Sequence, residues 1–577
     1  MTVRRPLRPS KSHLLRLVVA AGVLAAGFLA LRGYTTDDTY IHLRYAENLL
    51  ERGEFAFNPG VLTYGATSPL WVLGLAALLA LGVPPSTAPA LLGLMAAAGA
   101  LLLFDAILTR LPFRSSWKFW LLLLAAADVW FLRWARSGME TPLSGLVLLL
   151  LLWPLVAERL PGGWLAVDPG RPAGQGPPLW HRYLAWGVAS GLAALVRPEF
   201  LLMAPLALPW LLWFEYYRAS DAGGRPGRLR ARPHRLVVAA VAGWLLAAGP
   251  WLVYARLAFG RWLPGTVAAK SGDVGLDLQA VIAVVARALV QLGAVQAPLW
   301  AGLGLVAIAA LVIRRQPADV VSGRNQGSLE TLLEPPPPRT GRADTGLWTI
   351  WLAVALVGVA FTWTGVLVVG YALKQVWVIS RYVAPLTAPL LLALGVLGVW
   401  LADSLGATPR RARLGQMPLL AGAVLAVALN AYLMITQVVP HARRFPAGLE
   451  ACYLETGRWL RENTPPDVVV AALDIGGIGY ASDRHILDLM GLVSPEILTL
   501  GREMGFEELV ATGAWLHVRS PSGRRPDYLV DRTSGPPRWQ GQKLRGVTFE
   551  LLDTCVIEGV GLTESQPWTV ALYRLRR

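Results

Sequence analysis

Apolar runs of about 20 residues recur along most of this chain, and each is long enough for a helix to cross the hydrocarbon core of a bilayer. The sequence is 54% hydrophobic and only 16% charged over 577 residues, which is far too apolar for a soluble protein of this size. We therefore predict an integral membrane protein whose partner is the lipid bilayer.

Eleven segments are predicted to span the membrane. They lie at about residues 13–32, 87–109, 117–135, 141–158, 182–197, 199–215, 235–257, 291–313, 346–373, 383–403 and 416–438. The first resembles a signal peptide, but its apolar core is long and no small-residue cleavage site closes it, so we interpret it as an uncleaved span. Residues 68–82 are apolar but short and precede Pro84 and Pro85, which favours an interfacial or re-entrant helix.

The basic residues set the expected orientation. With the N-terminus in the cytoplasm, the cytoplasmic loops hold 24 lysines and arginines and the opposite short loops hold 9. This bias is the positive-inside pattern, and it predicts an external C-terminal region and a location in the cell membrane. The net charge of +16 comes from bases placed between apolar runs, so no nucleic-acid partner is expected.

The composition changes at about Pro440 and divides the chain into two predicted domains. Residues 1–439 form the transmembrane domain, which includes a long first external loop at residues 33–86. Residues 440–577 alternate β-like and helical runs, which indicates a small external α/β domain. Cys452 and Cys555 both fall in it, where an oxidising environment permits a disulfide, although two free buried thiols are the alternative.

The first external loop begins with two adjacent acids, Asp37 and Asp38, at the exit of the first span. Beyond them Ile41, Tyr45 and Leu49 share one helical face, which predicts an amphipathic helix lying on the membrane. Asp38 could simply cap this helix. A cap needs only one acidic residue, so the pair suggests a further role.

The run DDTYIHLRYAENLLERGEFAFNPG, followed by YGATSPLW, resembles the first loop of bacterial GT-C glycosyltransferases. This superfamily includes protein O-mannosyltransferases, aminoarabinose transferases and mycobacterial arabinofuranosyltransferases. The stretches SGMETP, VRPE and LPGTVAAK follow in the same order, and DIGG and DLMGL occur in the tail. Two positions depart from the family pattern: Gly265 stands where an asparagine is common, and Met139 where a leucine is usual.

The resemblance implies an enzyme that moves a sugar from a polyprenyl-phosphate donor to a glycan, lipid or protein acceptor of the cell envelope, on the outer face of the membrane. A polyprenyl phosphate is a good leaving group, so the enzyme must deprotonate the acceptor hydroxyl and stabilise the departing phosphate. Asp37 is the candidate general base. Asp38 is its partner, or a ligand for an optional divalent cation such as Mg²⁺ or Mn²⁺.

Seven further residues are candidates for substrate binding. Alternatives stay open for most of them: Glu140 could be a charge at a helix start, Arg197 and Glu199 a structural pair, and the bases Lys270 and Arg381 headgroup ligands. We expect Asp37, Glu140, Arg197, Lys270 and Arg381 to line one cavity at the outer membrane boundary. The full set is His42, Glu140, Arg197, Glu199, Lys270, Arg381 and Tyr382.

Two other functions fit the same composition. A multi-span transporter of envelope precursors would also have many spans and intramembrane acids, but the sequence has no obvious inverted repeat. A non-catalytic scaffold for envelope assembly is the other, and the intact acidic pair argues against it. Within the spans, Asp128 is expected to face the bundle or to pair with Arg133.

Overall fold

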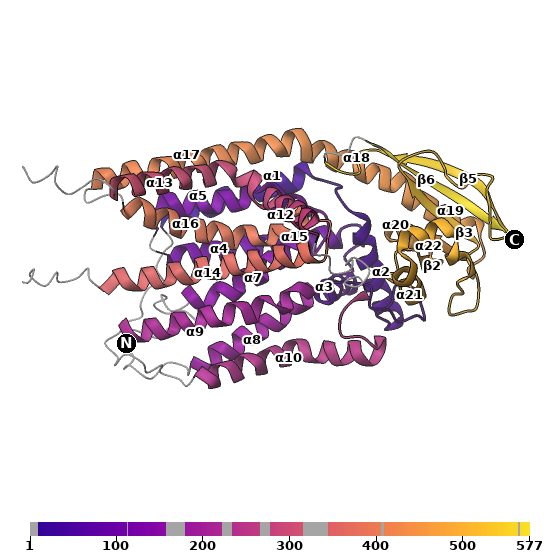
Figure 1. Cartoon of the computed structure of the whole chain (residues 1–577), viewed down its shortest axis with the longest axis horizontal. Helices are drawn as coiled ribbons and strands as arrows, with labels where there is room; N and C mark the ends of the chain where they lie inside the picture. The colour runs from indigo at the N-terminus through magenta and orange to yellow at the C-terminus, as the bar shows by residue number, and fades with distance from the viewer. Residues whose placement is uncertain are drawn as a thin grey trace, which may run out of the picture.

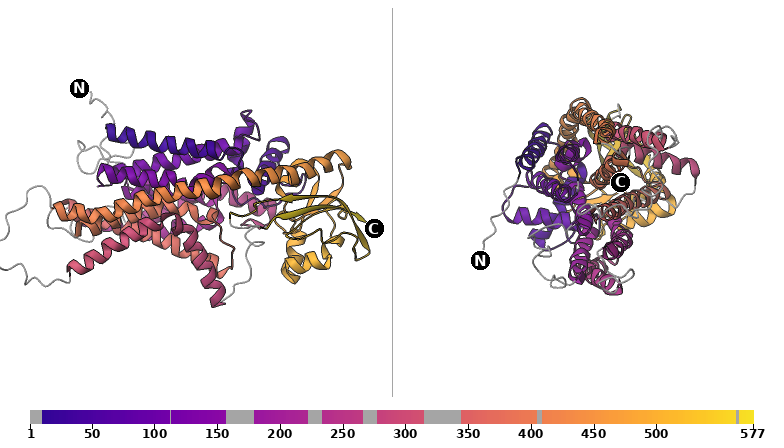
Figure 2. Two further views of the ribbon diagram at one scale, coloured as in Figure 1. Left: turned by 90° about the horizontal axis from the view of Figure 1, so that it is seen from above. Right: turned by 90° about the vertical axis from the view of Figure 1, so that its left-hand side faces the viewer.

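The structure is a computed structural model that describes residues 10–111, 113–156, 179–221, 233–265, 277–314, 344–404, 409–562 and 566–577. Long helices form a bundle, and the C-terminal residues form a separate sheet domain at one end of it (Figure 1). The two views in Figure 2 agree with this arrangement. α1 (Lys11–Ala30) begins at the end of the bundle that lies away from the sheet domain.

Eight helical segments of the described residues are long and apolar enough to cross a membrane, or nine if the bent pair α5 and α6 is one span. α7 and α8 occupy the two other predicted positions. The prediction of a multi-pass helical membrane protein with a C-terminal α/β domain is confirmed. Besides α1, the bundle contains α4 (Ala88–Arg110), α5 (Ser115–Ala127), α6 (Val129–Arg136), α7 (Thr141–Val156), α8 (Leu179–Val196), α9 (Met203–Asp221), α10 (Pro233–Phe259), α12 (Leu278–Gly293), α13 (Ala297–Arg314), α14 (Asp344–Leu373), α15 (Ser380–Val383), α16 (Thr387–Ser404) and α17 (Pro409–Leu433).

Asp128 lies at the 47° bend between α5 and α6 and has no exposed surface. Its carboxylate accepts hydrogen bonds from the backbone N–H of Phe131 at 2.8 Å and from the Gln296 amide at 3.2 Å. Asp128 therefore caps α6 and faces the bundle, where its charge needs such partners. Arg133 donates to the Tyr34 hydroxyl at 2.9 Å instead, so it is not the partner of Asp128.

One long helical run carries the chain from the bundle into the C-terminal domain. It continues from Gln416 to Asn463 as α17, α18 (Val439–Leu449) and α19 (Glu455–Asn463), joined by two π-helical turns, Met434–Val438 and Glu450–Leu454. The change in composition at Pro440 does not end this run, and Pro440 lies two residues after the first π-helical turn. Figure 1 shows α17 and α18 leading into the sheet domain.

The C-terminal domain has a six-stranded mixed sheet in the order β2-β1-β3-β6-β5-β4. β1 pairs in parallel with β2 and β3, and the remaining pairs are antiparallel. The β-like runs in the sequence, at residues 467–473, 528–531, 547–552 and 569–575, correspond to β1, β3, β5 and β6, while the short β2 and β4 were not predicted. The strands are β1 (Val469–Ala472), β2 (His485–Asp488), β3 (Tyr528–Thr533), β4 (Lys543–Leu544), β5 (Val547–Ile557) and β6 (Trp568–Arg576), and the remaining helices are α20 (Gly476–Ser482), α21 (Pro495–Met504) and α22 (Phe506–Thr512).

The parallel half of this sheet is buried on both faces. Along β1, Val469 and Ala471 pack into a core with Trp515, whereas Val470 and Ala472 point the opposite way. This second face packs into a core that contains aromatic residues of the first loop, residues 33–86, among them Phe57. The first loop therefore forms part of the hydrophobic core of the C-terminal domain, which fixes the two parts of the molecule together.

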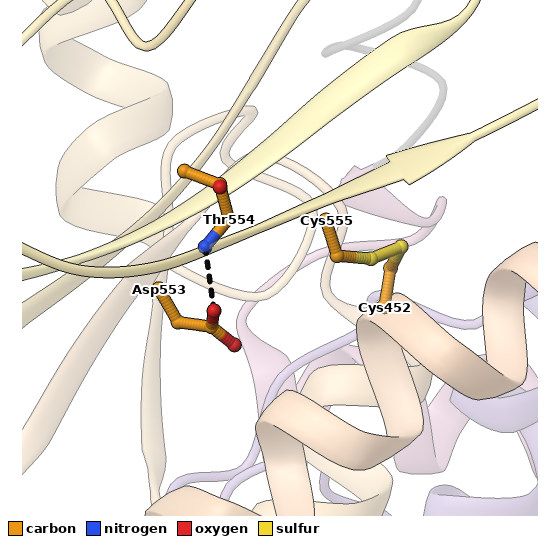
Figure 3. The surroundings of a disulfide bond; sticks show 4 residues. All are labelled: Cys452, Asp553, Thr554 and Cys555. Atoms are coloured by element: carbon orange, nitrogen blue, oxygen red, sulfur yellow. Dashed lines mark hydrogen bonds between the residues drawn. A yellow bond between two sulfur atoms is a disulfide. The ribbon is translucent and has the colours of Figure 1, made fainter.

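A disulfide joins Cys452, in the second π-helical turn, to Cys555 in β5, with a Cα–Cα distance of 5.6 Å (Figure 3). It ties the end of the long helical run to the sheet. Beside it, the backbone N–H of Thr554 donates to the Asp553 carboxylate at 2.8 Å. Of the two states left open by the sequence, the structure has the bonded one.

Candidate functional site

The first loop forms two helices between the bundle and the C-terminal domain, α2 (Asp37–Arg52) and α3 (Pro69–Ala80). α3 has only 12 residues, which is too short to cross a bilayer. α2 is a helix as predicted, but its polar face is covered by α20 of the C-terminal domain. Arg44 forms an ion pair with Asp483 at 2.6 Å, and Tyr480 donates to Glu47 at 2.8 Å. The polar face of α2 therefore contacts the C-terminal domain.

The two acids at the start of α2 point to different parts of the molecule. Asp37 accepts hydrogen bonds from the backbone N–H groups of Gly476 at 2.9 Å and Gly477 at 2.7 Å, one to each carboxylate oxygen. The pKa of Asp37 is raised to about 7, chiefly by burial and next by the nearby Asp474, although the two backbone hydrogen bonds act in the opposite direction. Asp37 therefore contacts the C-terminal domain.

Asp38 instead contacts the bundle. Its carboxylate accepts a 2.7 Å hydrogen bond from Arg381, which lies on the short helix α15 and is only 8% exposed. The helix cap is Thr36, one residue before Asp37, so the interpretation of Asp38 as a simple cap is not supported. A buried arginine paired with a partly exposed carboxylate is a charge-assisted contact of the stronger kind.

A tight turn places Glu140 beside this pair. Gly138 has a φ of +85°, and a Cβ there would lie 2.6 Å from Thr39, the residue after Asp38, so only glycine fits. Thr39 in turn donates to the carbonyl of Ser137 at 2.8 Å. The segment that contains Glu140 is thus packed directly against the first turn of α2.

Glu140 belongs to a buried ionic group with Arg197 and Glu199. Arg197 donates to Glu140 at 3.0 Å and through Nε to Glu199 at 2.9 Å. Glu199 lies in the 3₁₀ turn Pro198–Leu201 and also accepts from the Tyr371 hydroxyl at 2.8 Å. The Tyr382 ring lies close to both arginines. The guanidinium carbon of Arg197 is 5.3 Å from the ring centre, and that of Arg381 is 5.4 Å from it.

These groups line a cavity of about 870 Å³. It is formed by residues at the ends of several helices, on the side of the bundle that faces the C-terminal domain, and not at the middle of the helices. The C-terminal domain contributes Arg502 from α21. Its ionic lining residues are Glu140, Arg197, Glu199, Arg261, Lys374, Arg381 and Arg502.

Five bases and two acids give this lining an excess of positive charge. Arg261, Lys374 and Arg502 make no side-chain hydrogen bond or ion pair with any described residue. In the lining of this cavity, two side-chain atoms that are shielded from solvent have no hydrogen-bond partner among the described residues, Oε2 of Glu140 and Nε of Arg381. Buried polar atoms are normally paired, so these two are exceptions in the wall of the cavity.

The structure brings most, but not all, of the predicted residues together. Glu140, Arg197, Glu199, Arg381 and Tyr382 line the cavity, and Asp38 contacts it through Arg381.

The other predicted residues lie elsewhere. Asp37 and His42 are not among the lining residues. The C-terminal domain binds Asp37, and His42 is buried. Lys270 lies outside the described residues. For the optional cation at Asp38, the described part of the chain contains no group of three or more histidines, cysteines or acids suited to hold a metal.

The comparisons with known proteins bear on the fold. No curated protein sequence matches the chain. A family model described as a domain of unknown function (DUF8728) matches residues 443–573. A crystal structure of ArnT from Cupriavidus metallidurans bound to undecaprenyl phosphate superimposes with a TM-score of 0.50 at 13% identity, and the match covers 97% of each chain. The chain has the GT-C fold. Two other structures are similar at lower scores: arabinofuranosyltransferase AftD from Mycobacteria (TM-score 0.49, 16% identity, 98% of this chain and 40% of that one) and the oligosaccharyltransferase of Archaeoglobus fulgidus (0.45, 15%, 90% and 69%). The fold assignment rests on ArnT.

Within this GT-C fold, the YGATSPLW, LPGTVAAK and DLMGL motifs lie close together at a junction between the bundle and the C-terminal domain. A Cβ on Gly65, from YGATSPLW, would lie 2.8 Å from the carbonyl of Leu492, which ends the DLMGL motif. Gly265, from LPGTVAAK, donates its N–H to the carbonyl of Tyr64 at 2.8 Å. Gly265 therefore acts through its backbone at this junction, where two loops and the C-terminal domain come close together.

Four residues of the cavity are not among those predicted from the sequence: Arg261, Tyr371, Lys374 and Arg502. Arg261 and Lys374 were counted only as bases of the outer loops, and Arg261 stands two residues before Leu263 of a recognised motif. Arg502 had no such signal, because it looks like an ordinary exposed base on an amphipathic helix.

Proposed function

We propose that this protein is a membrane glycosyltransferase that transfers a sugar from a polyprenyl-phosphate donor to a cell-envelope acceptor. The observation that carries the proposal is the basic cavity at the end of a GT-C bundle, bounded by both the bundle and the C-terminal domain. ArnT, which shares the fold, has been crystallised with undecaprenyl phosphate. A phosphate on a lipid at the membrane boundary is the ligand that such a cavity suits.

The donor phosphate would contact the bases that have no ionic partner among the described residues. Arg261, Lys374 and Arg502 come from three separate elements of the cavity wall and supply charge-assisted hydrogen bonds. The apolar part of the wall includes Met203 and Leu367. The opposite face of α14 borders a second, apolar groove of about 570 Å³ within the bundle, which is suited to hydrocarbon.

We assign the general base to Asp38 and not to Asp37. Asp38 contacts the cavity through Arg381, whereas both carboxylate oxygens of Asp37 are occupied by the C-terminal domain. In the proposed reaction the acceptor oxygen forms a bond to the anomeric carbon, its proton passes to Asp38, and the bond to the phosphate oxygen breaks with its electron pair. Arg381 and the unpaired bases stabilise the phosphate that leaves.

We further propose that the cavity opens on the outer face of the membrane. The bias in loop bases supports this orientation, since the cavity and the C-terminal domain share the end that carries few bases. The position of the cavity at helix ends also supports a transferase over a transporter, whose binding site would be expected near the middle of the bilayer.

The proposed transfer can be tested by measuring polyprenyl phosphate, because every donor of this class would release it. Purified protein in lipid nanodiscs is incubated with a panel of polyprenyl-phosphate sugars and cell-envelope acceptors, and released polyprenyl phosphate is measured by mass spectrometry. The proposal predicts acceptor-dependent release with at least one donor. Uptake of the lipid donor across a vesicle membrane without release of polyprenyl phosphate would support the transporter instead.

A further inference from the structure

The contact between Asp37 and the C-terminal domain has no role in the proposed reaction, yet it is among the most closely fitted in the molecule. An ideal Cβ on Gly476 would lie 2.0 Å from the carbonyl oxygen of Asp37 and 2.7 Å from its carboxyl carbon. Neither Gly476 nor Gly477 has a positive φ. Glycine is therefore needed at 476 because the backbone of α2 lies against it, and not because a turn requires it.

A second row of polar groups backs this contact from the C-terminal domain. Asp474 accepts a hydrogen bond from the Tyr453 hydroxyl, and it forms an ion pair with Arg532 at 3.0 Å. These bonds fix Asp474, the residue two positions before Gly476, and so fix the start of α20. The N–H groups of Gly476 and Gly477 are thereby presented in a constant position to the Asp37 carboxylate.

Because Asp37 and Asp38 are adjacent in the first turn of one helix, whatever fixes the first also fixes the second. The C-terminal domain binds Asp37, and Arg381 of the bundle binds Asp38. The first turn of α2 is therefore held from two sides by parts of the chain that are far apart in sequence. Two further polar contacts lie along α2, one between Glu47 and Tyr480 of α20 and one between Arg44 and Asp483 at the end of α20.

We propose that Asp37, Gly476 and Gly477 are positioning residues, through which the C-terminal domain holds Asp38 in the geometry needed for transfer. The C-terminal domain then takes part in catalysis without touching the donor at this point. This inference rests on the proposed function for its catalytic half. The contact itself can be tested separately.

The first measurement tests the contact without any assay of activity. Hydrogen exchange of the full chain in nanodiscs is followed by mass spectrometry in peptides that cover residues 475–480. In Asp37→Ala the amides of Gly476 and Gly477 lose their acceptor, and we expect their exchange to become about tenfold faster or more, since protection follows the free energy of local opening. Asp483→Ala, which breaks the ion pair with Arg44 at the end of α20, should leave these two amides protected. Unchanged exchange in Asp37→Ala would overturn the proposal.

The second measurement tests positioning with the donor for which the wild type is active. Asp37→Ala should lower kcat by about tenfold or more, on the lower part of the scale for misplaced catalytic groups, and change KM for the donor by less than about twofold. In an Asp38→Asn background, Asp37→Ala should cost less than about twofold, because the two residues act as one unit. A full further loss in that background would show that Asp37 acts independently and would overturn the positioning role.

If Asp37→Ala folds poorly, a pair of glycine variants provides a second test. Gly476→Ala is the test variant and Gly535→Ala is its control. Gly476→Ala should reproduce the loss of kcat, since its Cβ displaces the start of α2, whereas Gly535→Ala in the same domain has its nearest neighbour atom at 3.9 Å and should be silent. Equal rates for these two variants would contradict the proposal. If no donor supports transfer by the wild type, the proposed function fails, and the exchange experiment alone decides whether the contact exists.

Discussion

Arg381 donates a 2.7 Å hydrogen bond to the carboxylate of Asp38, across a sequence separation of 343 residues. The pair joins the first loop to the short helix α15, which precedes α16. It also links the candidate base to the cavity, because Arg381 lines the cavity and Asp38 does not. This single contact makes Arg381 the residue whose replacement should affect both donor binding and the base.

We expect Arg381→Ala to lower kcat/KM for the donor by about 10²-fold or more, since it removes a charge from the phosphate site and leaves Asp38 without its buried partner. Arg381→Lys keeps the charge but loses the planar group, so its loss should be smaller. Steady-state kinetics measure both. Arg458→Ala, which breaks an exposed ion pair of the C-terminal domain, is the control and should change neither parameter. Equal activity of Arg381→Ala and wild type would contradict this role.

The stability of the folded protein should depend on pH through the titration of the Asp37 carboxyl. Burial raises its pKa to about 7, above the value near 4 of an unfolded chain. Between those values the folded state binds more protons than the unfolded state, so the stability contributed by Asp37 falls as pH rises through this window.

We therefore expect the Tm of the wild type to fall more between pH 5 and pH 8 than that of Asp37→Asn, whose amide does not titrate. Thermal unfolding in detergent measures this, with Glu507→Gln as a variant at an exposed carboxylate. If the wild type and Asp37→Asn show parallel curves, Asp37 does not titrate in this range.

The disulfide should stabilise the C-terminal domain strongly, since it closes a loop with a sequence separation of 103 residues. Chain-entropy arguments give about 4–5 kcal/mol for a loop of that size. We expect the double variant Cys452→Ser, Cys555→Ser to unfold its C-terminal domain at a clearly lower denaturant concentration. A reducing agent should lower the wild type to the same midpoint and leave the variant unchanged. A wild type insensitive to reduction after unfolding and refolding would argue against the bond.

The orientation of the molecule can be tested with single cysteines at two exposed positions, Ser10 before α1 and Ser534 after β3. The native cysteines are bonded to each other and should not react. Because the two positions lie at opposite ends of the bundle, an impermeant thiol reagent added to intact cells should label Ser534→Cys and reach Ser10→Cys only after permeabilisation. Labelling of both in intact cells would contradict the proposed topology.

The sequence predicted much of the fold because span length and apolar runs are local properties. The position of every predicted span is occupied by helix in the described residues. The extent of the last helix was not predictable, because Pro440 and a change in composition suggest an end, whereas tertiary packing and two π-helical turns carry the helix on to Asn463. The strand β2 was missed since only two of its four residues are apolar, whereas β1, which is equally short, is entirely apolar.

The site was predictable only in part, for a similar reason. Glu140, Arg197 and Arg381 stand out in sequence as charges at the ends of apolar runs. The partner of Asp37 does not, since backbone N–H groups leave no trace in a pattern of side chains. The different roles of Asp37 and Asp38 depend on which part of the molecule each carboxylate faces, and that is a property of tertiary structure.

The most direct test of the account is the rate of polyprenyl-phosphate release by Asp38→Asn, compared with wild type under the same donor and acceptor. The substitution keeps the size of the side chain and can still accept a hydrogen bond from Arg381, so the protein should unfold at a similar temperature. The account predicts a rate at least about 10²-fold lower, the usual scale for loss of a general base. A rate within about twofold of wild type, from a variant that folds normally, would contradict the assignment of Asp38 as the base.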